Sequence, residues 1–171
     1  MNYPARESAP ALRRLLAALA LLVASGVQAA SGDALFAMTL SGSDDKPIAL
    51  ETFRGKPLIV NFWARWCAPC RVEIPELVKT QDEYRKRGLQ VLGIGIEDKA
   101  ESVRDFMKAY EMNFTVLLAR DKGIELMQAL GNSKAGLPYT IVLNRRGEIV
   151  ASKLGVMSRA DLDAAAVAAL K

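Results

Sequence analysis

The stretch PLIVNFWA at residues 57–64 is almost continuously apolar, and it leads directly into the segment RWCAPC, which holds both cysteines of the chain. A strand with apolar side chains on both faces suits the centre of a sheet that is covered on both sides. Cys67 and Cys70 are separated by two residues and stand at the expected start of a helix. This stretch therefore predicts a layered α/β architecture with a thiol pair at the end of a central strand.

Strand and helix patterns alternate along the rest of the chain. Strands are expected at residues 35–40, 57–64, 89–96, 114–119, 139–144 and 148–154. Helices are expected from the cysteine pair to Arg87 with Gly88 as the stop, over 99–111 behind a capping pattern of Asp98 and Glu101, over 121–130, and from Ser158 onward. The last two strands are joined by the turn NRRG as an antiparallel hairpin. The order predicts a mixed sheet flanked by helices.

The first thirty residues have the pattern of an export signal. Arginines at positions 6, 13 and 14 precede an apolar run at 15–27, and small residues follow at Val27 and Ala29. The run is short for a bilayer span, which needs about 20 residues. We therefore expect a signal peptide over residues 1–29 and one domain over 30–171, with an uncleaved anchor or a buried core helix as the alternatives. Export predicts a periplasmic location, where idle cysteines become disulfides.

Composition excludes several classes of function. The formal net charge is +4, but no stripe of basic residues with interleaved aromatics indicates nucleic-acid binding. The chain contains no histidine, which rules out Ser/His/Asp and Cys/His catalysis and every metal site that needs an imidazole. Arg65 and Arg71, which flank the cysteine motif, are expected to be solvated.

Two structural roles for the cysteine pair are weak. A disulfide that closes a loop of two intervening residues constrains the unfolded chain very little. A structural zinc ion needs four ligands, and two thiolates supply only half of them unless a second molecule shares the site.

A redox role gives each position a physical reason. At a helix N-terminus the thiol of Cys67 should ionise more readily than a free cysteine, which makes it the candidate nucleophile. Cys70, one turn inward, can attack a mixed disulfide on Cys67 and release the partner in reduced form. Ala68 and Pro69 add no thiolate stabilisation, so the pair is expected to act as a reductant.

The segments VNFWARWCAPC, GLPYT and TIVLNRRGEIV resemble the TlpA/ResA group of exported thioredoxin-like proteins, and the resemblance covers roughly residues 35–170. It implies a thioredoxin fold with an extra N-terminal strand or strands. It also implies an inserted central β-α element, which fits the expected helix at 99–111 and strand at 114–119. In this family the proline of the GxPxT stretch is cis and packs opposite the CxxC motif, a position held here by Pro138.

The resemblance also implies roles for neighbouring residues. The backbone of Leu137 would pair with a bound substrate strand, and Trp66 would form part of the substrate-facing surface. Glu73 matches the ResA-type glutamate three residues after the second cysteine, and would raise thiol pKa values and accept a proton when Cys70 attacks. A plain first-turn carboxylate that complements the helix dipole is the alternative. Asn61 stands where thioredoxin has a buried aspartate, and an amide cannot take up a proton.

The resemblance finally implies a periplasmic thiol:disulfide oxidoreductase that reduces protein disulfides, with no cofactor or metal beyond the Cys67–Cys70 disulfide. A membrane-embedded thiol donor would re-reduce it. The implied clients are cysteines that must be reduced before they bind haem or copper, in an apocytochrome c or in a copper-site protein of cytochrome oxidase. Two alternatives remain: a thiol peroxidase of the same fold, although no PxxxTxxC stretch is present, and a copper-binding chaperone, although the six methionines are scattered.

Overall fold

Strand β3 (Leu58–Trp63) holds the apolar run, and all six of its residues are buried. The computed structural model describes residues 31–97 and 99–171, so the segment 1–29 expected to be a signal peptide lies outside the described residues. Seven strands form one sheet in the order β2-β1-β5-β4-β3-β6-β7. The other strands are β1 (Thr39–Gly42), β2 (Pro47–Ala49), β4 (Gln90–Gly95), β5 (Thr115–Leu118), β6 (Tyr139–Leu143) and β7 (Ile149–Leu154).

The central strands are parallel and the flanking strands are antiparallel. β3 and β5 both pair in parallel with β4. β6 lies antiparallel to β3, and β7 antiparallel to β6. The predicted mixed α/β sheet of thioredoxin type is therefore confirmed, and the C-terminal hairpin forms as the sequence indicates.

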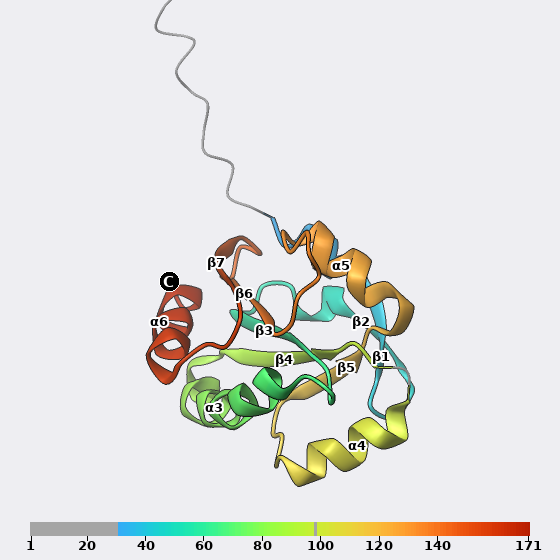
Figure 1. The fold of residues 1–171 in the computed structure, drawn as a ribbon. Coiled ribbons are helices and arrows are strands. Elements are labelled where there is room, and N and C mark those ends of the chain that lie inside the picture. Colours follow the sequence, from blue (N-terminus) through green and yellow to red (C-terminus); the bar gives the residue numbers. More distant parts are fainter. Residues whose placement is uncertain (1–30, 98) are drawn as a thin grey trace, which may run out of the picture.

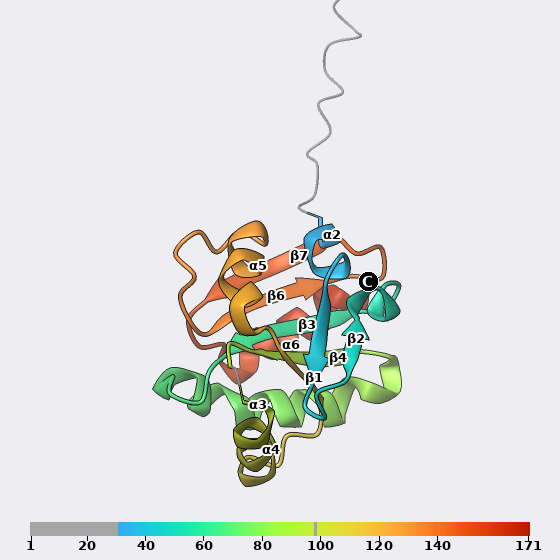
Figure 2. The same cartoon turned by 90° about the vertical axis from the view of Figure 1, so that its right-hand side faces the viewer.

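Helices cover both faces of the sheet, as Figures 1 and 2 show. The long helix α3 (Ala68–Tyr84), α4 (Ala100–Ala109) and α6 (Arg159–Ala169) contribute to one apolar cluster with β3 and β4. The short helices α2 (Asp33–Phe36) and α5 (Gly123–Ala129) contribute to the cluster on the opposite face. The described part of the chain also contains three 3-10 turns: η1 (Leu50–Phe53), η2 (Arg85–Arg87) and η3 (Arg120–Lys122). Two buried faces explain why β3 is apolar without alternation.

The N-terminal end of the domain corrects one prediction. The strand expected at 35–40 begins only at Thr39, and its first residues form helix α2. Leu35 and Phe36 are consecutive and both buried, whereas successive side chains of a strand point to opposite faces. A single helical turn lets both pack on the same side of the sheet. The extra N-terminal strands that the resemblance implies are β1 and β2, which extend the sheet beyond β5.

The inserted β-α element is present as α4 and β5, between β4 and α5. The N-cap of α4 is Lys99, without a side-chain hydrogen bond. Asp98, on which the predicted capping pattern with Glu101 depends, lies outside the described residues. Phe106 of α4 stacks on Trp63 at 5.1 Å between ring centroids. The apolar face of α4 therefore holds the helix against the end of β3, close to the cysteine motif.

Candidate active site

Cys67 and Cys70 are joined by a disulfide bond with an S–S distance of 2.09 Å. Cys67 is the N-cap of α3, and its Sγ accepts a hydrogen bond from the backbone N–H of Cys70 at 3.2 Å. Cys70 is completely buried, while Cys67 is 5% exposed. Unpaired N–H groups at a helix N-terminus favour a negative charge. The arrangement can therefore stabilise a thiolate on Cys67 once the disulfide is opened.

The two tryptophans that flank the motif have opposite environments. Trp66, immediately before Cys67, is 71% exposed, whereas Trp63 at the end of β3 is fully buried. A large aromatic side chain that is mostly in water contributes little to the core, and such residues are common where partners dock. Trp66 is therefore placed where it can contact a molecule that approaches the disulfide.

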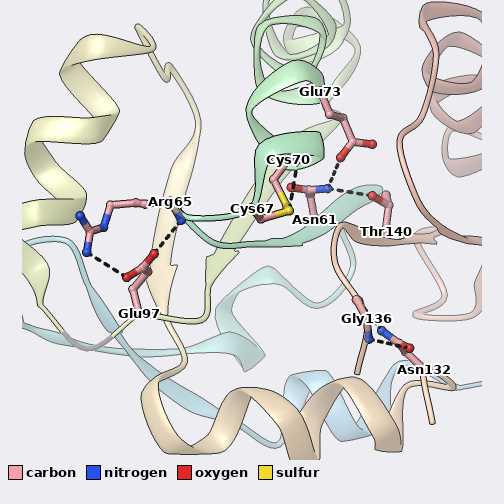
Figure 3. The surroundings of a disulfide bond; sticks show 9 residues. All are labelled: Asn61, Arg65, Cys67, Cys70, Glu73, Glu97, Asn132, Gly136 and Thr140. Carbon is pink, nitrogen blue, oxygen red and sulfur yellow. Dashed lines mark hydrogen bonds and ion pairs between the residues drawn. A yellow bond between two sulfur atoms is a disulfide. The ribbon is translucent and has the colours of Figure 1, made fainter. Parts of the chain in front are cut away.

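The carboxylate of Glu73 is buried one turn beyond Cys70 and is 1% exposed. Its Oε1 accepts the backbone N–H of Met157 at 2.7 Å, and its Oε2 accepts the amide Nδ2 of Asn61 at 2.9 Å. The same Nδ2 atom donates to Thr140 Oγ1 at 2.9 Å. Figure 3 shows Glu73, Asn61 and Thr140 beside the disulfide. Because Glu73 lies beyond the first turn of α3, the alternative of a first-turn carboxylate that complements the helix dipole does not hold.

Burial raises the pKa of the Glu73 carboxyl above its ordinary value. The hydrogen bonds from Met157 and Asn61 and the positive charge of Lys153 oppose this rise only in part. A carboxyl group whose pKa is raised takes up a proton closer to neutral pH than an exposed glutamate does. Glu73 is thus suited to exchange a proton in the environment of Cys70.

The loop before β6 reaches the same end of the sheet. The Leu137–Pro138 peptide bond is cis, as the resemblance implies. Tyr139, the next residue, pairs with Phe62 of β3, so the proline lies level with the chain that leaves β3 toward Cys67. Leu137 is half-buried and Pro138 is buried. The loop and the cysteine motif therefore form neighbouring parts of one surface.

Three polar residues of this region were missed in the sequence analysis. Asn132 holds the loop before the cis-proline, because its Nδ2 donates to the carbonyl of Gly136 at 2.8 Å and its Oδ1 accepts the Gly136 N–H at 3.3 Å. Thr140 supports the amide of Asn61. Glu97 binds Arg65, two residues before Cys67. Only Thr140 carried a signal in the sequence, because it is the threonine of the GxPxT pattern.

Within residues 31–97 and 99–171, no group of three or more Cys, Asp or Glu side chains is arranged to hold a metal ion. Over the same part of the chain, no helix has the length and apolar character that crossing a membrane requires.

A mixed sheet with helices on both faces, a CxxC disulfide at the N-terminus of the first long helix, and a cis-proline beside it define the class of thioredoxin-fold thiol:disulfide oxidoreductases. The Redoxin family model matches residues 30–169, and the chain belongs to that family.

Individual relatives agree with this assignment. The chain is similar to the thiol-disulfide oxidoreductase ResA of Bacillus subtilis, with 30% identity over 119 residues that cover 70% of this chain and 64% of that protein. It is also similar to ResA of Halalkalibacterium halodurans, with 30% identity over 130 residues, or 76% of this chain and 72% of that protein. The resemblance to ResA-type proteins is thereby confirmed.

Solved structures extend the similarity to three dimensions. A thiol:disulfide interchange protein of the thioredoxin family from Chlorobium tepidum aligns with a TM-score of 0.67 and 31% identity, over 78% of this chain and 93% of that one. StoA from Bacillus subtilis aligns with a TM-score of 0.60 and 27% identity, over 75% of this chain and 94% of that one. The predicted thioredoxin fold is confirmed.

Proposed function

We propose that this protein is an exported reductant of protein disulfides, in which Cys67 is the nucleophile, Cys70 the resolving thiol and Glu73 the proton acceptor. The observation that carries the proposal is the placement of the disulfide. Its outer sulfur is the N-cap of α3 beside the exposed Trp66, and a buried carboxylate lies one turn behind its inner sulfur. The pattern of basic residues, apolar run and small residues at positions 1–29 supports export.

The reaction begins with the reduced protein. The thiolate of Cys67 attacks one sulfur of a client disulfide, so that a mixed disulfide forms, the client S–S bond breaks, and the departing client thiolate takes up a proton. Cys70 then gives its proton to the carboxylate of Glu73 and attacks the sulfur of Cys67. The bond between Cys67 and the client breaks, and the second client thiolate takes up a proton from solvent. The client leaves as a dithiol with two added electrons, and the protein is left with the Cys67–Cys70 disulfide. An external dithiol donor must return the two electrons.

Glu73 suits this step because of its surroundings. Burial favours its neutral form, whereas the hydrogen bonds from Met157 and Asn61 favour the carboxylate. The opposing effects leave a group that can take the proton of Cys70 and release it again, with a pKa above that of an exposed glutamate. Asn61 holds the carboxylate in place but takes no part in proton transfer.

The docking site is proposed to comprise Trp66 and the loop of Leu137 and Pro138. Trp66 offers an exposed aromatic surface, and the backbone before the cis-proline is proposed to pair with an extended segment of the client. The proposed clients are cysteines that take up haem or copper, in apocytochrome c or in a copper-site protein of cytochrome oxidase. A membrane-embedded thiol protein is the proposed donor. The family resemblance supports these two assignments.

A peptide that contains an oxidised C-x-x-C-H segment provides the test. Reduced protein should convert the peptide to its dithiol in a single turnover, while the Cys70→Ala variant should stop at a mixed disulfide that mass spectrometry detects. Hydrogen peroxide is the comparison substrate. Turnover of peroxide with no reduction of the peptide would replace the proposal with the thiol peroxidase alternative.

A further inference from the structure

Glu97 is a second buried carboxylate near the cysteine motif, and the proposed reaction does not use it. It follows strand β4 in the connection to α4 and is only 8% exposed. A buried carboxylate is costly unless hydrogen bonds and an opposite charge compensate for its lost hydration. Its partners therefore show what this residue does.

Both oxygens of Glu97 bind Arg65, which flanks the cysteine motif. Oε1 accepts the backbone N–H of Arg65 at 2.6 Å, and Oε2 accepts the guanidinium of Arg65 at 3.2 Å. In Figure 3 the side chain of Arg65 extends away from the disulfide toward Glu97. The Glu97 carboxylate thus forms a hydrogen bond to the main chain two residues before Cys67, and the guanidinium of Arg65 balances its charge.

The segment held in this way has few other anchors. The Ile96 N–H donates to the carbonyl of Trp63 at 2.9 Å, and the Cys67 N–H donates to the carbonyl of Ala64 at 3.1 Å. Trp66 is mostly in water and cannot fix the loop by packing. The bond from Arg65 N–H to Glu97 is therefore well suited to define the path of residues 64–67.

We propose that Glu97 is a positioning residue for Cys67: its bond to the Arg65 N–H fixes the loop that sets the Cys67 sulfur at the N-terminus of α3. The inference rests on the proposed function, in which Cys67 is the nucleophile. Glu97 also stands at the start of the inserted β-α element, two residues after the end of β4 and three before the start of α4. A direct polar contact consequently joins the insertion to Arg65, in the segment that leads to the reactive cysteine.

Three substitutions separate this role from a general effect of charge. Glu97→Gln keeps an oxygen that can accept the Arg65 N–H but removes the negative charge. Glu97→Ala removes both, and Glu97→Asp keeps the charge on a side chain that is shorter by one carbon. Glu101→Ala is the matched control, because Glu101 is an exposed carboxylate in the first turn of α4.

The readout is the rate at which iodoacetamide alkylates Cys67 at pH 7, with Cys70 replaced by alanine in every variant so that one thiol reacts. We expect Glu97→Ala to react about tenfold more slowly, the factor that corresponds to one pKa unit at the thiol. Glu97→Asp should also be slow, whereas Glu97→Gln and Glu101→Ala should stay within about twofold of the parent.

The alkylation rates of the Glu97 variants, compared with one another, test the proposed positioning role. An unchanged rate in a folded Glu97→Ala variant overturns the inference, and so does a Glu97→Gln rate as low as that of Glu97→Ala. If the alanine variant does not fold, the contrast between Asp and Gln gives the same decision. Alkylation needs no client, so a protein that fails to reduce peptide disulfides would remove the proposed function and leave this comparison intact.

Discussion

The side-chain amide of Asn61 on β3 donates to the carboxylate of Glu73 on α3, with 2.9 Å between Nδ2 and Oε2. This bond links the central strand of the sheet to the helix that carries both cysteines. It also places an amide that cannot be protonated against a carboxyl that can. Of these two side chains, therefore, only Glu73 can exchange a proton beside the disulfide.

Replacement of Glu73 by glutamine should change how stability depends on pH. Because burial raises the pKa of Glu73, the folded protein binds a proton more tightly than the unfolded chain does. Folding is thus favoured below the ordinary carboxyl pKa, and that contribution falls as the pH rises toward the raised value. The unfolding free energy of the parent relative to Glu73→Gln should decline with pH, by at most about 1.4 kcal/mol per unit.

Denaturant unfolding between pH 4 and pH 8 measures this difference. Glu76→Gln is the control, because Glu76 lies on the same helix but pairs with Lys79 at the surface. A parent-minus-variant difference that is constant with pH, or that rises, contradicts the raised pKa.

The two cysteines should differ in reactivity as they differ in position. Cys67 is the N-cap of α3, whereas Cys70 is completely buried. Reduced Cys70→Ala protein, which keeps Cys67, should react with iodoacetamide at pH 7 at least about tenfold faster than Cys67→Ala protein, because thiolate fraction and access both favour the outer thiol. Equal rates, or faster reaction of Cys70, would reverse the assignment of nucleophile and resolving thiol.

The two tryptophans of the motif should separate docking from stability. Trp66→Ala should change the free energy of unfolding by less than about 0.5 kcal/mol, because the side chain is 71% exposed. The same substitution should lower kcat/KM for a peptide disulfide by about tenfold if Trp66 is a docking aromatic. Trp63→Ala should destabilise the fold by about 3–5 kcal/mol, because Trp63 is fully buried. Unchanged kinetics in Trp66→Ala would remove this residue from the docking site.

The contribution of the α6 N-terminus to stability should depend on pH in the opposite sense to the contribution of Glu73. Asp161 completes a capping box with Ser158 and pairs with Lys153, and these contacts lower the pKa of Asp161 to about 2. Their contribution is present above the ordinary carboxyl pKa and is lost as the pH falls through about 2. Asp161→Asn should therefore lower the Tm at pH 6 and have a smaller effect at pH 2.5. An equal loss at both pH values argues against an electrostatic contribution.

The sequence predicts the fold well where one residue pattern has one physical meaning. The apolar run of β3 requires two covered faces, and Gly88 ends the helical region of residues 68–87 with a φ of 91°, which suits glycine. The pattern fails at Leu35 and Phe36, because a short apolar run suits a strand and a buried helical turn equally well. Only the packing of both side chains on one face distinguishes the two.

The residues of the candidate site also divide into those that the sequence predicts and those that only the structure reveals. The positions of Cys67 and Cys70 follow from the CxxC spacing behind the central strand, and that of Pro138 follows from the resemblance to the TlpA/ResA group. The resemblance implies a role for Glu73, but its burial does not follow from the sequence, because its partner Met157 lies 84 residues further along the chain. Arg65, expected to be solvated, is half-buried and bound to Glu97. The contact between the loop after β3 and the connection after β4 depends on the parallel pairing of these strands, and no local sequence pattern predicts it.

The reduction potential of the Cys67–Cys70 pair tests the central claim most directly. The purified protein is equilibrated with dithiothreitol and glutathione buffers, and tryptophan fluorescence follows the fraction reduced. A reductant of protein disulfides should have a potential near or below about −220 mV, in the range of thioredoxin-like reductants. A value near about −120 mV is that of a strong oxidant and would contradict the proposed direction, together with the donor and the clients.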